Sequence, residues 1–219
     1  MIGVQKYVKQ LPANLSGMAV GGFPTNLMPK TDEPNFQGVK HMIEALKGKR
    51  HYITVKADGS SGTIYRNGDW FGCCSRNLEF KRSETTAVWV IADRYDLENK
   101  LPDGYAIQFE MCGPGIQKNR LALEKIEPFI FNVWSIQERK YLDAGDAFKF
   151  AKDIDVPTVE VEVWDEIFEV EDFNELRKMA EGKYFSGKVR EGIVIRPMIE
   201  EMVRGERLSF KVINLDYKD

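Results

Sequence analysis

The stretch HYITVKADGSSGTIYRNG, residues 51–68, decides the fold. It contains two strand-like runs, 51–56 and 62–66, and a third run follows at 70–74. Asn67 and Gly68 stand between the second and third runs, and both tolerate the positive φ that a type I′ turn requires. We therefore predict a hairpin here, within an antiparallel sheet.

Helical and strand patterns follow one another over the rest of the chain. Apolar residues between positions 39 and 46 recur at the spacing of one helix face, and Gly48 stands where that helix is expected to end. Further helices are expected at 88–101, 147–151 and 173–180, and further strands at 105–111, 129–136, 158–163, 192–196 and 208–213. The pattern indicates an α+β fold in which helices flank antiparallel sheets.

The composition favours one ordinary domain. The chain has 219 residues, of which 43% are hydrophobic, which is enough to bury a core. Residues 1–23 read as a loop-rich lead-in, because glycine, proline and asparagine are frequent there and on to residue 36. We assign residues 24–219 to a single domain of catalytic size.

Several classes of protein are excluded by the same numbers. Three cysteines cannot form a disulfide framework, and the first residues do not resemble a signal peptide. The longest apolar run, 87–92, is far below the roughly 18 residues of a membrane span. We expect a soluble, cytoplasmic protein. A net charge of -3 excludes a uniformly basic nucleic-acid binder but leaves room for a local basic groove.

With only two histidines, a histidine-rich zinc or iron site is not expected. A metal would be held by carboxylates, which favours Mg²⁺ or Mn²⁺.

Lys56, Asp58 and Gly59 form the first candidate site. Alternate residues of a strand share a face, so Lys56 and Asp58 are expected to point the same way, and Gly59 allows a close approach at the strand end. Taken alone, Lys-x-Asp-Gly is a short pattern, and a surface lysine before a turn is the favoured explanation by roughly four to one.

Further motifs follow in a fixed order. They are PKTDE (29–33), SRN (75–77), FEMCGPGIQKN (109–119), FIFNVW (129–134), EGIVIR (191–196) and SFKVIN (209–214). Together with Lys56-x-Asp-Gly they resemble the covalent nucleotidyltransferases, the superfamily of polynucleotide ligases and mRNA capping enzymes. The sequence most resembles RNA ligases of the RNA ligase 5 and RNA ligase 2 types, from about residue 24 to the end.

The resemblance implies an ATP-dependent RNA ligase that acts through a lysyl-AMP intermediate. By it, Lys56 is the nucleophile that attacks the α-phosphate of ATP, and Lys211 is the second catalytic amine. The enzyme would then transfer AMP to an RNA 5′-phosphate and seal it to a 3′-OH end, as in RNA repair.

The resemblance also implies roles for other residues. Glu191 and Glu110 would hold hydrated Mg²⁺ or Mn²⁺ or contact the ribose, and Asp58 would contact the metal's waters or orient the lysine. Arg76 would bind the ribose or the 3′-OH strand, and Phe131 would stack on adenine, although core packing explains Phe131 about as well. The backbone of residues 54–55 would contact adenine.

Two departures from the resembled pattern stand out. Ser209 lies two positions before Lys211, where several relatives carry another lysine. These relatives carry an accessory domain, and we do not expect the residues before Lys56 or the eight after Lys211 to form one. We therefore expect a minimal enzyme, a shortened form, or a ligase that needs a partner chain.

Two alternatives remain open. The first is another polynucleotide ligase or a capping-type nucleotidyltransferase. The second is a nucleic-acid-binding remnant without turnover, against which the retention of Lys56, Glu110, Glu191 and Lys211 speaks.

Overall fold

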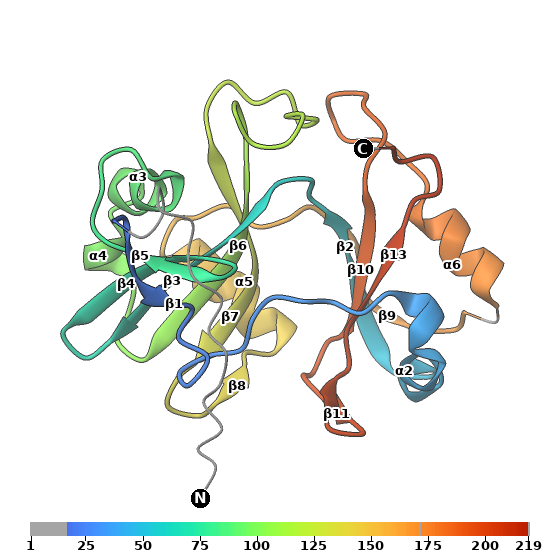
Figure 1. Cartoon of the computed structure of the whole chain (residues 1–219). Coiled ribbons are helices and arrows are strands. Elements are labelled where there is room, and N and C mark those ends of the chain that lie inside the picture. Colours follow the sequence, from blue (N-terminus) through green and yellow to red (C-terminus); the bar gives the residue numbers. More distant parts are fainter. Residues whose placement is uncertain (1–16, 171, 219) are drawn as a thin grey trace, which may run out of the picture.

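The computed structural model describes residues 17–170 and 172–218 (Figure 1). The strands are β1 Ala19–Gly22, β2 Arg50–Lys56, β3 Ser60–Asn67, β4 Trp70–Ser75, β5 Leu78–Phe80, β6 Tyr105–Cys112, β7 Glu127–Ser135, β8 Lys140–Tyr141, β9 Val161–Ile167, β10 Gly192–Pro197, β11 Met202–Val203, β12 Glu206–Arg207 and β13 Phe210–Ile213. The helices are the 3-10 turn η1 Phe36–Gly38, α2 Lys40–Leu46, α3 Ala87–Arg94, α4 Leu97–Lys100, α5 Ala144–Asp153 and α6 Phe173–Ala180. The predicted α+β class with antiparallel sheets is confirmed.

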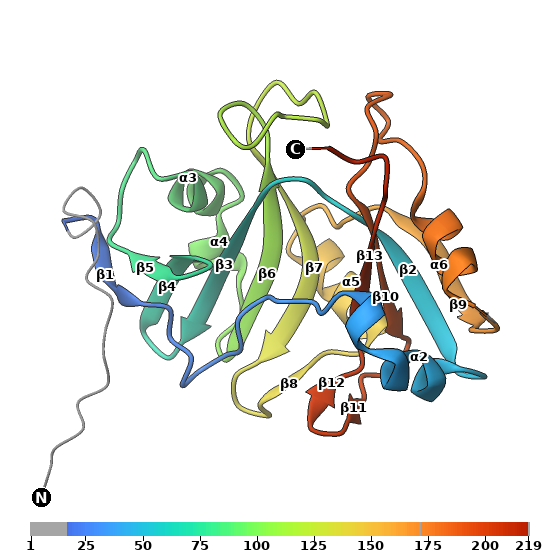
Figure 2. The same cartoon turned by 45° about the vertical axis from the view of Figure 1, so that its right-hand side comes forward.

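Two sheets carry the fold. The larger has the order β1-β5-β4-β3-β6-β7-β8, and the smaller has the order β13-β10-β2-β9 (Figures 1 and 2). Strands β2 and β3 are consecutive in the chain but lie in different sheets, so residues 57–59 carry the backbone from one sheet to the other. The sequence motif around Lys56 therefore lies at the junction of the two sheets.

The β3–β4 hairpin is confirmed, but its turn differs from the prediction. Asn67 pairs with Trp70, so Gly68 and Asp69 are the two turn residues. Gly68 has φ +60, while Asp69 is not in the left-handed region. A glycine with positive φ at the first turn position is typical of a type II′ turn, so the predicted type I′ turn is wrong.

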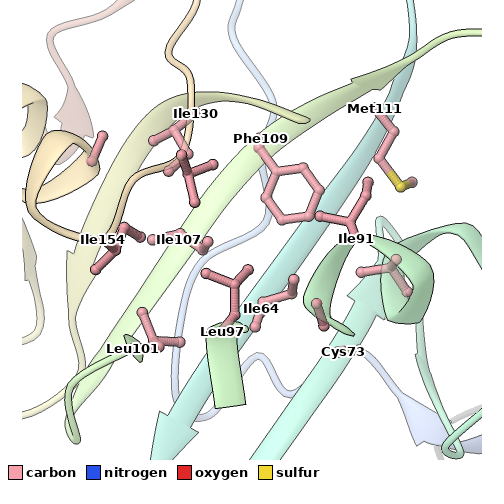
Figure 3. Packing of buried hydrophobic residues seen from close by; sticks show 14 of the residues in the cluster. Ile64, Cys73, Ile91, Leu97, Leu101, Ile107, Phe109, Met111, Ile130 and Ile154 are labelled. Atoms are coloured by element: carbon pink, nitrogen blue, oxygen red, sulfur yellow. The ribbon is translucent and has the colours of Figure 1, made fainter. Parts of the chain in front are cut away.

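Helices cover the outer side of each sheet. One apolar core lies between the larger sheet and helices α3, α4 and α5, and Phe109, Ile107 and Leu97 are fully buried in it (Figure 3). A second core packs the smaller sheet against α2 and α6 through residues such as Ile193 and Phe210. Because the apolar side chains face these helices, the opposite, more polar faces of the two sheets are left to line a site between them.

Several elements differ from their predicted ranges; α5, for example, begins three residues earlier and ends two residues later than predicted. The helix expected over 88–101 is two helices, because Asp96 adopts a left-handed conformation with φ +54 between α3 and α4. Strand β9 spans Val161–Ile167, three to four residues later than predicted. The predicted lead-in contains β1, which pairs with β5 at the edge of the larger sheet. The rest of that prediction, residues 1–16, lies outside the described residues, and the division at residue 24 stays a prediction.

Among the described residues, no helix combines the length and the apolar character needed to cross a membrane.

Candidate active site

A pocket of about 630 Å³ lies between the two sheets. All seven residues predicted for the site line it: Lys56, Asp58, Arg76, Glu110, Phe131, Glu191 and Lys211. They come from both sheets and from segments that are far apart in the sequence. The structure therefore brings together every side chain that the sequence motifs singled out.

Lys56 stands at the end of β2 and faces Glu191. Its Nζ atom lies 2.7 Å from a carboxylate oxygen of Glu191, and both side chains are largely shielded from solvent. The Tyr184 hydroxyl donates to the Lys56 carbonyl over 2.7 Å and accepts the Glu191 backbone N–H over 3.1 Å. One tyrosine thus fixes the backbones of both partners of the ion pair.

Glu110 is the second carboxylate beside this pair. Burial raises its pKa to about 7, the positive charge of Lys56 opposes the rise, and the negative charges of Glu191 and Asp58 add to it. A carboxyl group with a pKa near neutrality can hold or release a proton within the pocket at physiological pH.

Asp58 is buried directly after the strand that presents Lys56. One of its carboxylate oxygens lies 3.1 Å from the Nε atom of Arg120, whose guanidinium group stacks 4.5 Å from the centre of the Tyr217 ring. Arg120 also donates to the carbonyl of Lys218. This one arginine therefore joins the β2–β3 connection to the last residues that the structure describes.

Gly59 completes the connection because only a glycine fits there. A Cβ atom at this position would lie 2.2 Å from the carbonyl oxygen of Met111 and 2.8 Å from the Sγ atom of Cys112. The close approach predicted from the sequence is confirmed, and its partner is strand β6.

The smaller sheet forms the floor of the pocket in three rows. Val194 of β10 pairs with Thr54 on one side and with Lys211 on the other, so the side chains of this middle row share a face. Lys56 lies one row toward one end, and Arg196 lies one row toward the other. The floor thus places Lys56 one row away from Lys211, on the side opposite Arg196.

Phe131 comes from the opposite wall. It lies on β7 of the larger sheet, is half-buried, and lines the pocket together with Val194 of the smaller sheet. An aromatic ring and an aliphatic side chain on facing sheets form a slot that suits a flat, apolar-faced group.

Glu33 and Arg196 close the end of the pocket away from Lys56. The Nη2 atom of Arg196 lies 2.8 Å from Glu33, and its Nε atom donates to the Ser209 hydroxyl over 3.0 Å. Burial alone would raise the pKa of Glu33, but the charges of Arg196 and Arg207 lower it to about 2. The position where several relatives carry a lysine, Ser209, is therefore occupied by a hydroxyl that bonds a buried arginine.

Arg76 lies at an exposed edge of the pocket and forms an ion pair with Asp32. A further contact joins the same two segments, since Lys30 donates to the Asn77 side chain over 2.8 Å. The Thr31 hydroxyl lies 2.7 Å from the Ser61 hydroxyl of β3. The PKTDE and SRN motifs are thus neighbours in space, 40 residues or more apart in the sequence.

No group of three or more histidine, cysteine, aspartate or glutamate side chains in the described part of the chain is arranged to bind a bare metal ion. Glu110 and Glu191 still provide hard oxygen donors at the pocket, which suits a cation that keeps most of its water shell.

Comparison with known proteins identifies the family. A family model described as RNA ligase matches residues 49–213, which is most of the chain. The chain belongs to the RNA ligase family.

Solved structures of the Naegleria gruberi RNA ligase resemble this family member closely. A variant with ATP and manganese gives a TM-score of 0.83 at 30% identity, and the match covers 97% of this chain and 63% of that one. A variant with AMP and manganese gives 0.82 at 30% identity, covering 96% and 62%. The protein with pyrophosphate gives 0.81 at 30% identity, covering 96% and 62%. The chain thus spans a little under two thirds of these RNA ligases. The search among curated proteins gave no match.

Sequence reasoning about this RNA ligase family member missed four residues of the pocket or its rim. Glu33 is the last residue of the PKTDE motif and Arg120 directly follows the FEMCGPGIQKN motif, but the sequence alone assigns neither of them a role. Arg196 ends the EGIVIR motif and reads as an ordinary strand arginine. Tyr217 belongs to no motif. Only the fold shows that these side chains converge.

Proposed function

We propose that this protein is an ATP-dependent RNA ligase that becomes adenylylated on Lys56. The observation that carries the proposal is the position of the Lys56 amine, which lies at the junction of the two sheets, in a pocket of about 630 Å³, 2.7 Å from Glu191. The Naegleria gruberi RNA ligase, solved with ATP, with AMP and with pyrophosphate, supports a nucleotide as the ligand.

In the first step Lys56 attacks the α-phosphorus of ATP. A nitrogen–phosphorus bond forms and the bond from that phosphorus to pyrophosphate breaks, while the ammonium group of Lys56 gives up two of its three protons to solvent and keeps one on the phosphoramidate nitrogen. The ion pair with Glu191 keeps the amine oriented before ATP binds but must open for attack. Lys211, which lines the same pocket, is placed to neutralise charge that develops on the α-phosphate.

A divalent cation, Mg²⁺ or Mn²⁺, would neutralise the phosphates and stabilise the departing pyrophosphate. Glu191 and Glu110 would hold it through its waters, since the described residues offer no cluster for direct coordination. Asp58 already faces Arg120, so we assign it to holding the β2–β3 connection and thereby Lys56.

The base of ATP would lie in the slot between Phe131 and Val194. Stacking on Phe131 suits any purine, so the choice of adenine depends on polar groups at the edge of the base, among them the backbone at residues 54–55. We expect ATP to be preferred over GTP.

Two further steps would join RNA. AMP would pass from Lys56 to an RNA 5′-phosphate, and a 3′-OH would then displace AMP to form the phosphodiester bond. Arg76 at the exposed edge of the pocket is placed to contact a second strand or the ribose. An accessory domain or a partner chain stays an expectation for these two steps.

Covalent labelling tests the first step. The purified chain, incubated with α-phosphate-labelled ATP and Mg²⁺, is expected to take up label that survives denaturation, and labelled GTP is expected to give much less. Lys149, an exposed lysine paired with Asp153 on α5, provides the matched control. Lys149→Ala is expected to label like the native chain, whereas Lys56→Ala is expected to take up none. Equal labelling by GTP and ATP would favour a capping-type enzyme.

A further inference from the structure

Phe185 stands in solvent at the tip of a tight turn, residues 183–189. Lys183 and Val189 form an antiparallel bridge, the Tyr184 N–H donates to the Lys188 carbonyl over 2.9 Å, and the Gly187 N–H donates to the Tyr184 carbonyl over 2.8 Å. The turn is thus closed by backbone hydrogen bonds. Phe185 is nevertheless 72% exposed, which is as high as any large apolar side chain that the structure describes.

The residues on either side of Phe185 fasten this turn to the mouth of the pocket. The Tyr184 hydroxyl donates to the Lys56 carbonyl over 2.7 Å, and the Ser186 hydroxyl donates to the Arg120 carbonyl. In Figures 1 and 2 the turn lies at one end of the molecule, beside the loop that follows β6 and close to the C-terminal end. The backbone that carries this exposed ring is therefore fixed by hydrogen bonds, one residue away from the contact to the backbone of the proposed nucleophile.

The surface around the ring is basic. Lys183 and Lys188 flank it within the turn, and Lys118 lies on the neighbouring loop and lines the pocket. All three are exposed, and none forms an ion pair with a residue that the structure describes. Some lysines elsewhere on the surface, such as Lys49 and Lys149, are paired with carboxylates, while others, such as Lys40 and Lys152, form no ion pair with a described residue either. A partner that covers this turn must tolerate unpaired positive charge next to a flat apolar ring.

We propose that Phe185 stacks on a nucleobase of the RNA strand whose end enters the pocket, while Lys183 and Lys188 contact its phosphates. A single-stranded nucleic acid offers flat bases that can stack on the ring and negative phosphates that can pair with the lysines. An aromatic side chain between cations is a common way to bind it. The proposal rests on the proposed function, because it assigns part of the substrate surface of the same site.

The test separates nucleotide chemistry from RNA binding. Self-adenylylation by ATP is measured first, and sealing of a pre-adenylylated 5′ end to a 3′-OH RNA strand is measured second. For Phe185→Ala, the ratio of the sealing rate to the adenylylation rate is expected to fall by roughly 5- to 100-fold at sub-saturating RNA, which is the range for loss of one stacked base. Phe185→Trp is expected to keep the ratio, and Phe185→Leu to behave like Phe185→Ala.

Ile199 provides the matched control, since it is 66% exposed but does not line the pocket around Lys56. Ile199→Ala is expected to leave both rates unchanged. Binding of RNA is also expected to quench the fluorescence of the indole in Phe185→Trp, and an abasic substitution at one terminal position of the RNA is expected to remove the quenching.

Three results would overturn the inference. They are an unchanged ratio in Phe185→Ala, full activity in Phe185→Leu, and quenching that no abasic position removes. The second would indicate an apolar protein partner instead of a base. Absence of self-adenylylation in the native chain would overturn the proposed function itself, and is thereby distinguished from a failure of this inference.

Discussion

Glu110 and Glu33 both line the pocket, yet their pKa values move in opposite directions. Burial and two neighbouring carboxylates raise the pKa of Glu110 to about 7. For Glu33 burial acts in the same direction, but Arg196 and Arg207 outweigh it and lower the pKa to about 2. The difference lies in the neighbours, because one carboxyl shares its surroundings with other acids and the other is held by two arginines.

The raised pKa of Glu110 makes folding pH-dependent. The ordinary value is 4.5, so the folded chain binds this proton more tightly than the unfolded chain, and the stabilisation is lost as pH rises from 4.5 through 7. Glu110→Gln removes the titration. We expect the variant to gain about 2 kcal/mol in free energy of unfolding relative to the native chain between pH 5 and pH 8.

Urea unfolding of both proteins at these two pH values measures the gain. The same difference between the two proteins at pH 5 and at pH 8 would show that Glu110 is ionised throughout.

At the scale of elements, the segment of residues 29–35 is fastened to the smaller sheet through Glu33. The backbone N–H of Lys211 donates to the Pro34 carbonyl over 2.9 Å, and Glu33 meets Arg196 of β10 across a separation of 163 residues. The segment forms one wall of the pocket, so its attachment matters for the site as well as for stability.

Glu33→Gln is expected to lower the free energy of unfolding by about 3 kcal/mol at pH 7, because it leaves the buried Arg196 without its carboxylate partner, whereas Arg207 keeps its ion pair with Glu200. The contribution is present above pH 4.5 and is lost as pH falls through about 2, since the folded pKa is lowered. Glu138, whose ion pair with Lys140 is well exposed, is the control. Glu138→Gln is expected to cost less than about 1 kcal/mol. Equal costs for the two variants in urea unfolding at pH 7 would contradict the assignment.

The β2–β3 connection leads to a second prediction at this scale. Gly59→Ala would force a Cβ atom against the Met111 carbonyl, so we expect a loss of about 1–3 kcal/mol in stability and a large loss of ATP labelling. Gly145 in α5 has open space around it, and Gly145→Ala is expected to be neutral or slightly stabilising. Thermal unfolding and labelling of both variants check this. Normal labelling by Gly59→Ala would show that the close approach does not position Lys56.

Local sequence patterns predicted most of the helices and strands. The contacts between these elements could be known only from the folded structure. The spacing of apolar residues predicted α2, and the range predicted for α6 is the observed one. The predicted turn type was wrong because the pairing of β3 with β4 decides which two residues form the turn, and these are Gly68 and Asp69. The pairing of Glu33 with Arg196 could not be predicted, since no local pattern links residues so far apart in the chain.

At the scale of the whole molecule, the site lies where two sheets meet, and the remaining surface is mildly acidic. The net charge is -3, and lysines that form no ion pair with another described residue lie near the pocket mouth. The motifs predicted the seven proposed site residues that line the pocket, some at strand ends or in connections and others, such as Glu110 and Phe131, inside strands. Arg120 and Tyr217 escaped prediction because their role depends on how two loops meet.

The small basic surface predicts how RNA joining depends on salt. Few phosphates can be contacted at once, so we expect sealing of a pre-adenylylated 5′ end to be measurable at low salt and to weaken at moderate salt. We expect ligation of an ordinary 5′-phosphate nick to be weak unless a partner is supplied. Gel assays of both substrates at two salt concentrations check this. Equally fast sealing of the two substrates at both salt concentrations would show that this chain binds RNA without a partner.

Mapping the nucleotide adduct tests the central claim most directly. The chain is incubated with ATP and Mg²⁺, its intact mass is measured, and the modified peptide is sequenced by mass spectrometry. We predict one AMP per chain, attached to the Nζ atom of Lys56, and no adduct on Lys56→Ala. An adduct on another residue, or none on a folded native chain, would contradict the claim that Lys56 is the nucleophile.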